Sequence, residues 1–371
     1  NTQPPRPPCM WDACEALLKA SLAPKEDAVL GAWVRGWRAN MPCFPRLHVI
    51  TAAASHARAR SFFRAVPNVT LRDNDFPPRV ATDPYRLIQI HIMWADNFTA
   101  PHTHYVLFFD VDAVPVLPLR CHLLFDDDER LLLHGWNRNA STGWVEPVTR
   151  VFARALSRWG ETFKAPLSPL LQGSDFMTFW PIVAPRPLLP EVRRLVSREY
   201  HTYFDDAFAT MPAPSHSDLL GKAALLLHPQ AARHVPCPPL RHATASPPPH
   251  DKTDMYASCF EWAAAVEHVR HPLQGCHTSC TRFKSYWQAA DYAHQLLNQS
   301  AAFVRGEAPL PPKLWHYRAN RSEVQLQRAR AFVLRDDPGR TCGLRRGHAS
   351  SAWRAGTAPP AESAVGATVP D

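Results

Sequence analysis

The sequence predicts an α/β fold in which a mostly parallel sheet is flanked by helices. Segments with strand character alternate with helix-like segments along the first half of the chain, and this order is typical of parallel strands joined by helices. The chain has 371 residues, of which 46% are hydrophobic and 10% aromatic, so it can bury a full core. No stretch of about 18 uncharged apolar residues is present, which excludes a transmembrane helix within this sequence.

The individual elements are predicted from hydrophobic spacing and from boundary residues. Apolar residues at helical spacing predict helices over residues 27–38, 56–65, 84–97, 145–159, 189–200, 217–227, 256–268 and 286–299. Short runs of apolar and β-branched residues predict strands over residues 46–51, 68–72, 105–109, 131–136 and 176–183. Pro181 places the last of these at a sheet edge or near the end of the strand. The proline-rich segment 236–254 is expected to be a loop.

Asparagine and cysteine usage indicate an oxidising, secretory compartment. About one Asn-x-Ser/Thr triplet is expected by chance. The sequence contains five such triplets, at Asn68, Asn97, Asn139, Asn298 and Asn320. The nine cysteines fit disulfide formation in a lumen, although an odd number leaves one of them without a partner in the chain. The net charge of +8 comes from scattered arginines without a basic block, so nucleic acid is not an expected partner.

Two carboxylates follow the most apolar strand in the stretch HYVLFFDVDAVPVLP. Asp110 and Asp112 are two residues apart, so in an extended chain their side chains point to the same side. Two anions at that spacing repel each other unless a cation lies between them or one of them is protonated. Mn²⁺ or Mg²⁺ takes oxygen ligands and bridges phosphates, which points to a phosphate-bearing substrate. The alternative is a pair of solvated carboxylates in a turn.

The longer stretch MWADNFTAPHTHYVLFFDVDAVPV resembles a poorly characterised group of GT-A-fold glycosyltransferases. In that group a helix with Trp-Ala-Asp leads into a strand that ends in Asp-x-Asp. The resemblance covers roughly residues 27–317 and is sharp only over 85–116. It implies a GT-A-like, Rossmann-type, mostly parallel sheet with helical C-terminal additions. It also implies transfer of a hexosyl or pentosyl group from a nucleotide-sugar donor to a glycan or glycoprotein acceptor, with Mn²⁺ (or Mg²⁺) bound to the donor diphosphate.

The resemblance also assigns roles near the donor. Asp112 would be the more direct metal ligand, and Asp110 would contact the ribose, or the metal through water. Arg86 and Gln89 lie one turn apart on the preceding helix and could reach the nucleotide or its phosphates, or else form a solvated helix face. His316, in the segment KLWHY, would supply a third metal ligand, the alternative being a core or surface histidine.

An inverting transferase needs a base for the acceptor hydroxyl, and the resemblance places it at the start of a helix. Asp218 fits this position, with an ordinary first-turn carboxylate as the alternative. Asp175, after Gly173 and Ser174, is the rival candidate. The pair Asp205 and Asp206 is expected on a helix surface. The His-Pro-Gly-x-Lys-Pro-Trp ending of some retaining families is absent, so the stereochemistry stays open.

The expected organisation is a stem or linker over residues 1–10, a catalytic domain over 11–335 and a disordered tail over 343–371. Within the domain, a nucleotide-binding half would cover about 11–136 and an acceptor half about 137–335. The expected location is the secretory lumen, in the Golgi or secreted, with any membrane anchor upstream of Asn1. Two other functions stay open. One is a haloacid-dehalogenase-like phosphatase with Asp110 as nucleophile and Asp112 as acid and base. The other is a non-catalytic, carbohydrate-binding relic of the transferase fold.

Overall fold

The computed structural model describes the strands and helices that build the core, with gaps in several connections and at both ends of the chain. The described residues are 14–20, 22, 26–41, 44, 46–73, 84–111, 113–137, 148–154, 173–176, 181–212, 214–237, 266–268, 294–295, 297–299, 301–302 and 305. Asp112 and His316 therefore lie outside the described residues, as do the expected stem and tail.

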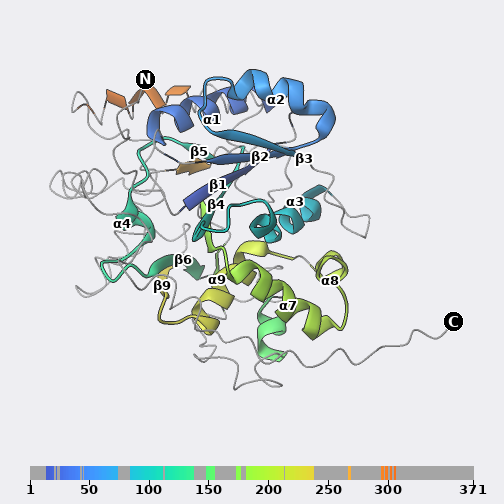
Figure 1. Ribbon diagram of the computed structural model, residues 1–371. Helices are drawn as coiled ribbons and strands as arrows, with labels where there is room; N and C mark the ends of the chain where they lie inside the picture. The colour runs from blue at the N-terminus through green and yellow to red at the C-terminus, as the bar shows by residue number, and fades with distance from the viewer. Residues whose placement is uncertain are drawn as a thin grey trace.

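A five-stranded, mostly parallel sheet forms the centre of the molecule (Figure 1). Its order is β3-β2-β1-β4-β8. The strands are β1 (Cys14–Lys19), β2 (Leu47–Thr51), β3 (Val69–Asp73), β4 (Tyr105–Asp110) and β8 (Ile182–Pro185). The first four are parallel to their neighbours, and β8 runs antiparallel to β4 at the edge. The predicted α/β fold with a mostly parallel sheet is confirmed. The strand expected over 176–183 corresponds to β8, which begins at Ile182, directly after Pro181, and lies at the sheet edge, one of the two positions that Pro181 indicated.

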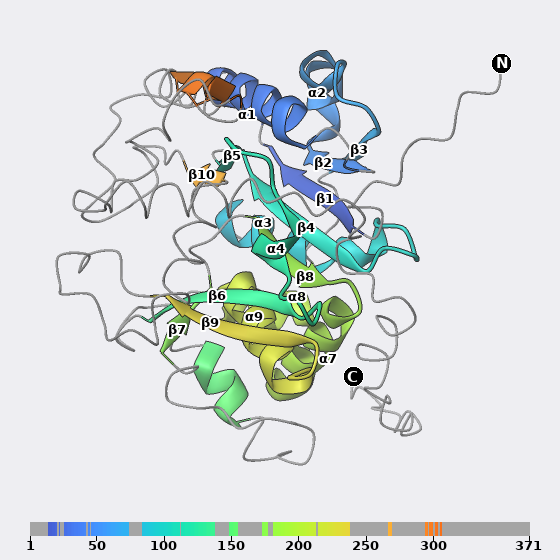
Figure 2. The same cartoon turned by 90° about the vertical axis from the view of Figure 1, so that its left-hand side faces the viewer.

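Helices cover both faces of this sheet (Figures 1 and 2). On one side lie α1 (Asp27–Asn40) and α2 (His56–Phe63), with the short turn η2 (Ala53–Ser55). On the other side lie α3 (Pro84–Met93), α7 (Leu188–Tyr200), α8 (Phe204–Thr210) and α9 (His216–Leu227). The short elements η3 (Ala95–Asn97) and α4 (Cys121–Leu124) flank β4 in sequence.

The core between α1 and the sheet is aromatic. Trp33 and Trp37 of α1 stack with ring centroids 5.1 Å apart, and both meet the edge of Phe109 on β4. This packing fixes the carboxyl end of β4, where Asp110 follows Phe109, against a rigid layer.

Two smaller sheets complete the fold. One has the order β7-β6-β9, formed by β7 (Ser174–Asp175), β6 (Leu131–Asn137) and β9 (Ala232–Cys237). Figures 1 and 2 both show β6 and β9 beside α9. The other pairs β5 (Ala113–Pro115) with β10 (Val266–His268). Two sequence predictions are wrong here. Residues 266–268 form a strand where a helix was expected, because they pair with β5, and β9 extends into the expected loop as far as Cys237.

The central strand β1 was not predicted, because two of its six residues are charged. The side chain of Glu15 is almost completely buried, which a strand tolerates only when the charge is satisfied. His48 Nε2 of β2 lies 2.7 Å from Glu15 Oε2, and the backbone N–H of Ala100 donates to the same oxygen at 3.3 Å. Glu15 is therefore stabilised by residues distant in sequence, and a prediction from local apolar patterns does not detect such contacts.

The Trp-Ala-Asp segment holds α7 against the end of α3. Arg193 of α7 donates to both oxygens of Asp96, at 2.6 and 2.9 Å, and also to the carbonyl oxygen of Met93. Its guanidinium lies 3.8 Å from the ring centroid of Trp94. Trp94 Nε1 in turn donates to Asp205 Oδ1 on α8 at 2.7 Å. The surface position expected for Asp205 is therefore wrong, because the indole of Trp94 binds and buries this carboxylate.

We expect Arg193→Ala to lower the free energy of unfolding by about 3–5 kcal/mol, because it leaves the largely buried carboxylate of Asp96 without its partner. The neighbouring Arg194 is exposed on the same helix, so Arg194→Ala should change stability by less than about 0.5 kcal/mol. Urea unfolding of both variants checks this. Equal stabilities for the two variants would show that the Arg193 contacts contribute little.

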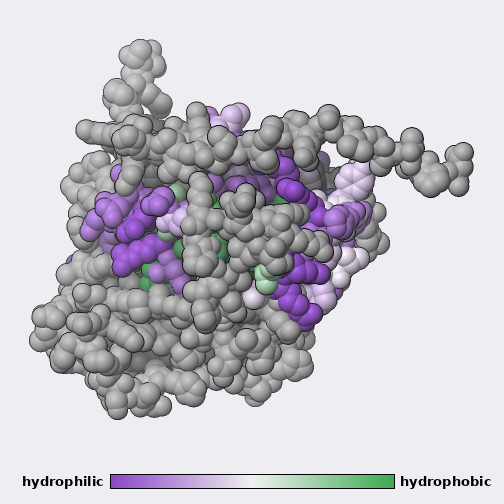
Figure 3. Space-filling view, turned by 90° about the horizontal axis from the view of Figure 1, so that it is seen from below, coloured by the Kyte–Doolittle hydropathy of each residue, from purple (hydrophilic) through white to green (hydrophobic). Residues whose placement is uncertain are grey.

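The described surface is mainly polar. On the face seen in Figure 3, hydrophilic side chains predominate and hydrophobic ones are visible only in small areas between them. Tyr203, at 62% exposure, is the large hydrophobic side chain that stands out at the surface of the described ranges. Within these ranges every helix is too short or too polar to cross a bilayer.

Candidate active site

The candidate donor site lies at the carboxyl ends of β1 and β4. These strands are neighbours at the centre of the sheet, and the chain order reverses between them, since β2 and β3 lie on one side and β4 on the other. Ligands of open α/β sheets bind in the crevice at such a reversal. Lys19 and Asp110 are register partners at this position, each the last residue of its strand. The fold therefore places an ammonium and a carboxylate side by side where a ligand is expected.

Lys19 is partly buried and has a defined partner. Its Nζ donates to His91 Nδ1 of α3 at 3.2 Å, which fixes this nitrogen of the imidazole as the acceptor. Burial lowers the pKa of Lys19 to about 8, and the charge of Asp110 acts in the opposite direction. Lys19 was not singled out from the sequence. The only available signal was a lysine at the end of a strand that was itself not predicted.

A divalent metal has one of its proposed ligands in the described part of the chain. Asp110 offers the oxygen donor that Mn²⁺ or Mg²⁺ prefers, at the edge where the sequence placed it. Asp112 and His316 lie outside the described residues. Among the residues that the structure does describe, no three His, Cys, Asp or Glu side chains form a group that could hold a metal. The donor chemistry of Asp110 fits a hard cation, and the rest of the ligand set stays a prediction.

Arg86 and Gln89 of α3 both make contacts within the protein. The Arg86 guanidinium donates to the carbonyl oxygen of Ala209 on α8. Gln89 is buried, and its Oε1 accepts from the backbone N–H of His216 at 2.9 Å, with His216 Nδ1 3.2 Å away. Gln89 thus joins α3 to the first turn of α9. Nucleotide binding by either residue stays a prediction.

A second polar cluster lies at the start of α9. Asp175 of β7, Asp218 of α9 and Lys222, one turn after Asp218, all have no exposed surface. Asp218 Oδ1 accepts from the backbone N–H of Phe176 at 2.7 Å. Lys222 Nζ donates to Thr149 Oγ1 at 2.7 Å. The two candidate bases predicted from sequence interact electrostatically with each other, and Lys222, which was not singled out from the sequence, interacts with both.

The charge balance of this cluster favours a bound proton. Burial, and then the charge of Asp175, raise the pKa of Asp218 to about 7, against the opposing effect of Lys222. Burial lowers the pKa of Lys222, and the two carboxylates oppose that shift. Two carboxylates share one ammonium, so one proton can be taken up or released near neutral pH. A group of this kind suits general acid–base chemistry.

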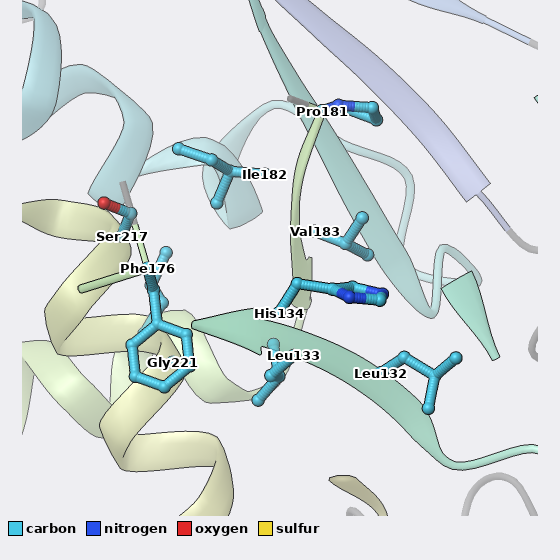
Figure 4. A pocket seen from close by; sticks show the side chains of 10 residues that line it. Leu132, Leu133, His134, Phe176, Pro181, Ile182, Val183, Ser217 and Gly221 are labelled. Atoms are coloured by element: carbon cyan, nitrogen blue, oxygen red, sulfur yellow. The ribbon is translucent and has the colours of Figure 1, made fainter. Parts of the chain in front are cut away.

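A small cavity lies between β6, β8 and the start of α9 (Figure 4). Its lining includes Ser217, adjacent to Asp218 in sequence, and Phe176, whose ring lies over Gly221. Pro181 and Ile182, at the beginning of β8, form another part of the wall. Ile182 pairs with Phe108 of β4, two residues before Asp110. The cavity therefore lies beside the helix start that carries Asp218, and Ile182 relates it to Phe108 of β4, although Lys19 and Asp110 are not among the residues that line it.

Two buried histidines, His134 and His216, and the partly buried His234 surround this region and should make the protein sensitive to acid. Burial lowers the pKa of His216 to about 3 and those of His134 and His234 to about 4. The unfolded chain binds these protons from about pH 6.5 downward and the folded chain does not, so acidification from that pH removes stability. The raised pKa of Asp218 has the opposite effect, since it adds stability on acidification, but it offsets only one of the three histidines.

We therefore expect the free energy of unfolding to fall between pH 6.5 and 4, on the order of 2 kcal/mol per pH unit. Thermal unfolding midpoints measured from pH 8 to pH 4.5 test this. A midpoint that stays constant or rises on acidification would contradict the burial of neutral histidines.

Comparisons with known proteins find fold similarity only among solved structures. No protein-family model matches the chain, and neither does any curated protein. An active-site mutant of LgtC matches at 15% identity with a TM-score of 0.45, covering 76% of this chain and 95% of LgtC. Mouse xyloside xylosyltransferase 1 matches at 14% identity with a TM-score of 0.36, covering 59% of this chain and 84% of the enzyme.

A third solved structure, glucosyl-3-phosphoglycerate synthase from Mycobacterium tuberculosis, contains Mn²⁺, UDP and glucosyl-3-phosphoglycerate. It matches at 14% identity with a TM-score of 0.31, covering 81% of each chain. LgtC is named a galactosyltransferase and the mouse protein a xylosyltransferase.

Proposed function

We propose that this chain is a glycosyltransferase that moves a sugar from a nucleotide-sugar donor to a glycan or glycoprotein acceptor. The observation that carries the proposal is the juxtaposition of Lys19 and Asp110 at the carboxyl ends of β1 and β4. A strand end with both charges suits a ligand that combines phosphates with hydroxyl groups. Asp110 is also the first carboxylate of the Asp-x-Asp motif.

The donor would bind with its diphosphate at this strand end. Asp110, together with Asp112 and His316, would hold Mn²⁺ or Mg²⁺, which when bound supplies Lewis-acid stabilisation of the leaving diphosphate. Lys19 and Asp110 are each half-buried at the end of an otherwise buried strand, which strengthens the interactions of their charges relative to bulk water. Either a hexosyl or a pentosyl group is compatible with these features.

Asp218 is the proposed proton acceptor for an inverting transfer. It would take the proton of the acceptor hydroxyl as that oxygen attacks the anomeric carbon and the bond to the diphosphate breaks. Its raised pKa matches this task at neutral pH. Asp175 is the alternative acceptor within the same cluster.

A screen of nucleotide sugars tests the proposed function. The purified protein should hydrolyse at least one of the UDP-, GDP-, CMP- and dTDP-linked sugars slowly without an acceptor, with a rate that rises on addition of MnCl₂ or MgCl₂. A phosphatase would instead cleave a phosphomonoester such as p-nitrophenyl phosphate. The phosphatase function requires the Asp-x-Asp motif on the first strand of the domain. In this chain three strands, β1 to β3, precede β4. A protein without either activity would correspond to the non-catalytic relic.

We further propose that the protein resides in the secretory lumen and carries N-linked glycans. Asn68, Asn97 and Asn298 are the acceptor asparagines within the described ranges, and all three are exposed. Cys121 forms a disulfide bond, which suits the same compartment.

The chain expressed through a eukaryotic secretory pathway should therefore lose mass on digestion with peptide-N-glycosidase F. Asn97→Gln, at the exposed end of η3, should remove one glycan with little change in stability. An unglycosylated secreted chain would contradict this location.

A further inference from the structure

The position of Lys19 is not explained by packing alone. A lysine that ends the central strand of a sheet could extend into solvent, where its charge is fully hydrated. Here the side chain is instead partly buried, with its ammonium hydrogen-bonded to His91 Nδ1 and acting electrostatically on Asp110. An ammonium in such a position loses part of its hydration, and this loss costs free energy. A charge retained at this cost, at the strand ends where open α/β sheets bind ligands, suggests a ligand for it.

We infer that Lys19 binds the diphosphate of the nucleotide-sugar donor, next to Asp110 at the end of β4. This inference rests on the proposed function. An ammonium has three N–H donors, and one of them goes to His91. The others are available to oxygen atoms of Asp110 and of a ligand. His91 belongs to the buried part of α3, so its hydrogen bond holds the flexible lysine in the crevice before the ligand arrives.

Lys19 also changes the expected role of the metal. From the sequence alone, compensation of the Asp110 charge was assigned entirely to a divalent cation. The structure supplies a positive charge from β1 at the same strand end. A nucleoside diphosphate should therefore retain measurable affinity when the metal is removed, and this residual affinity should depend on Lys19.

Isothermal titration of UDP and GDP, each with MnCl₂ and with EDTA, tests the inference on three proteins. These are the wild type, Lys19→Met and the control Arg38→Met. Methionine keeps most of the length of the lysine stem and removes its charge. Arg38 is exposed on α1, so its replacement removes the same charge from the surface. We expect Lys19→Met to lower the affinity for the nucleoside diphosphate that binds best by roughly 10- to 100-fold, both with MnCl₂ and with EDTA, because a charge-assisted hydrogen bond is lost.

Uridine and guanosine serve as ligands without phosphates. Their affinity should be unchanged in Lys19→Met, and Lys19→Arg should recover part of the diphosphate affinity because it restores the charge. Arg38→Met should match the wild type. Loss of nucleoside affinity in Lys19→Met would show that Lys19 acts on the nucleoside or on the fold, which would overturn the inference.

The two proposals fail in different ways. If the wild type binds a nucleoside diphosphate and Lys19→Met binds it equally well, Lys19 has no phosphate role and the transferase proposal is unaffected. If the wild type binds no nucleoside diphosphate and hydrolyses no nucleotide sugar, the proposed function is wrong and this inference falls with it.

Discussion

Asp110→Asn is expected to reduce metal-stimulated hydrolysis of the nucleotide-sugar donor roughly a thousandfold while the protein stays folded. The substitution keeps the shape of the side chain and removes the charge that a hard cation requires. Without the metal, the leaving diphosphate is no longer stabilised, so kcat should fall. Donor binding should change less, because it also depends on groups away from the metal. The measurement is initial-rate hydrolysis with and without MnCl₂.

Asp128 offers a matched control for this variant. Its side chain is 68% exposed and lies in the turn before β6, so Asp128→Asn removes the same charge from the surface. Its activity should equal that of the wild type. Wild-type activity of Asp110→Asn with full metal stimulation would mean that the end of β4 does not bind the metal.

Asp218→Asn is expected to lower kcat by about 10²- to 10⁴-fold, because an amide cannot accept the acceptor's proton. Its Oδ1 can still accept the hydrogen bond from the backbone N–H of Phe176. The wild-type rate should rise with pH through about 7, where the raised pKa of Asp218 lets it lose its proton. Asp218→Asn should lack this rising limb.

The stability of the same variant separates catalysis from structure. Asp218 is buried beside Asp175, and the two carboxylates share the charge of Lys222. Removing one carboxylate leaves Asp175 and Lys222 balanced, so Asp218→Asn should be at least as stable as the wild type at pH 8. A variant that is less stable and equally inactive would instead indicate a structural role. If Asp218→Asn is active and Asp175→Asn is not, the base is Asp175.

Much of the fold could be predicted from sequence because its elements carry local signals. The apolar run from Tyr105 to Phe109 and the helical spacing over 27–38 were both sufficient, and β4 and α1 are where they were expected. The central strand β1 was missed because Glu15 is satisfied by His48 and Ala100, which are distant in sequence. Short strands such as β5 and β9 depend on pairing partners and have no pattern of their own.

The candidate site shows the same division. Asp110 and Asp218 could be identified because one follows an apolar strand and the other opens a helix, and both positions have physical meaning. Lys19 could not, since it acquires its role from a carboxylate that only the fold brings close. Lys222 was missed although it lies one turn after Asp218 on the predicted helix, and only its interaction with Asp175 depends on the fold. Asp205 was misplaced because its partner Trp94 is 111 residues away.

The central claim is that a nucleoside diphosphate binds at the carboxyl ends of β1 and β4. Crystals grown with MnCl₂ and the nucleoside diphosphate selected by titration test it most directly, because anomalous scattering locates manganese independently of any assumed ligand pose. We predict a manganese peak beside Asp110 and the diphosphate between that peak and the ammonium of Lys19. A nucleotide bound elsewhere, with this strand end unoccupied at saturating concentration, would contradict the account.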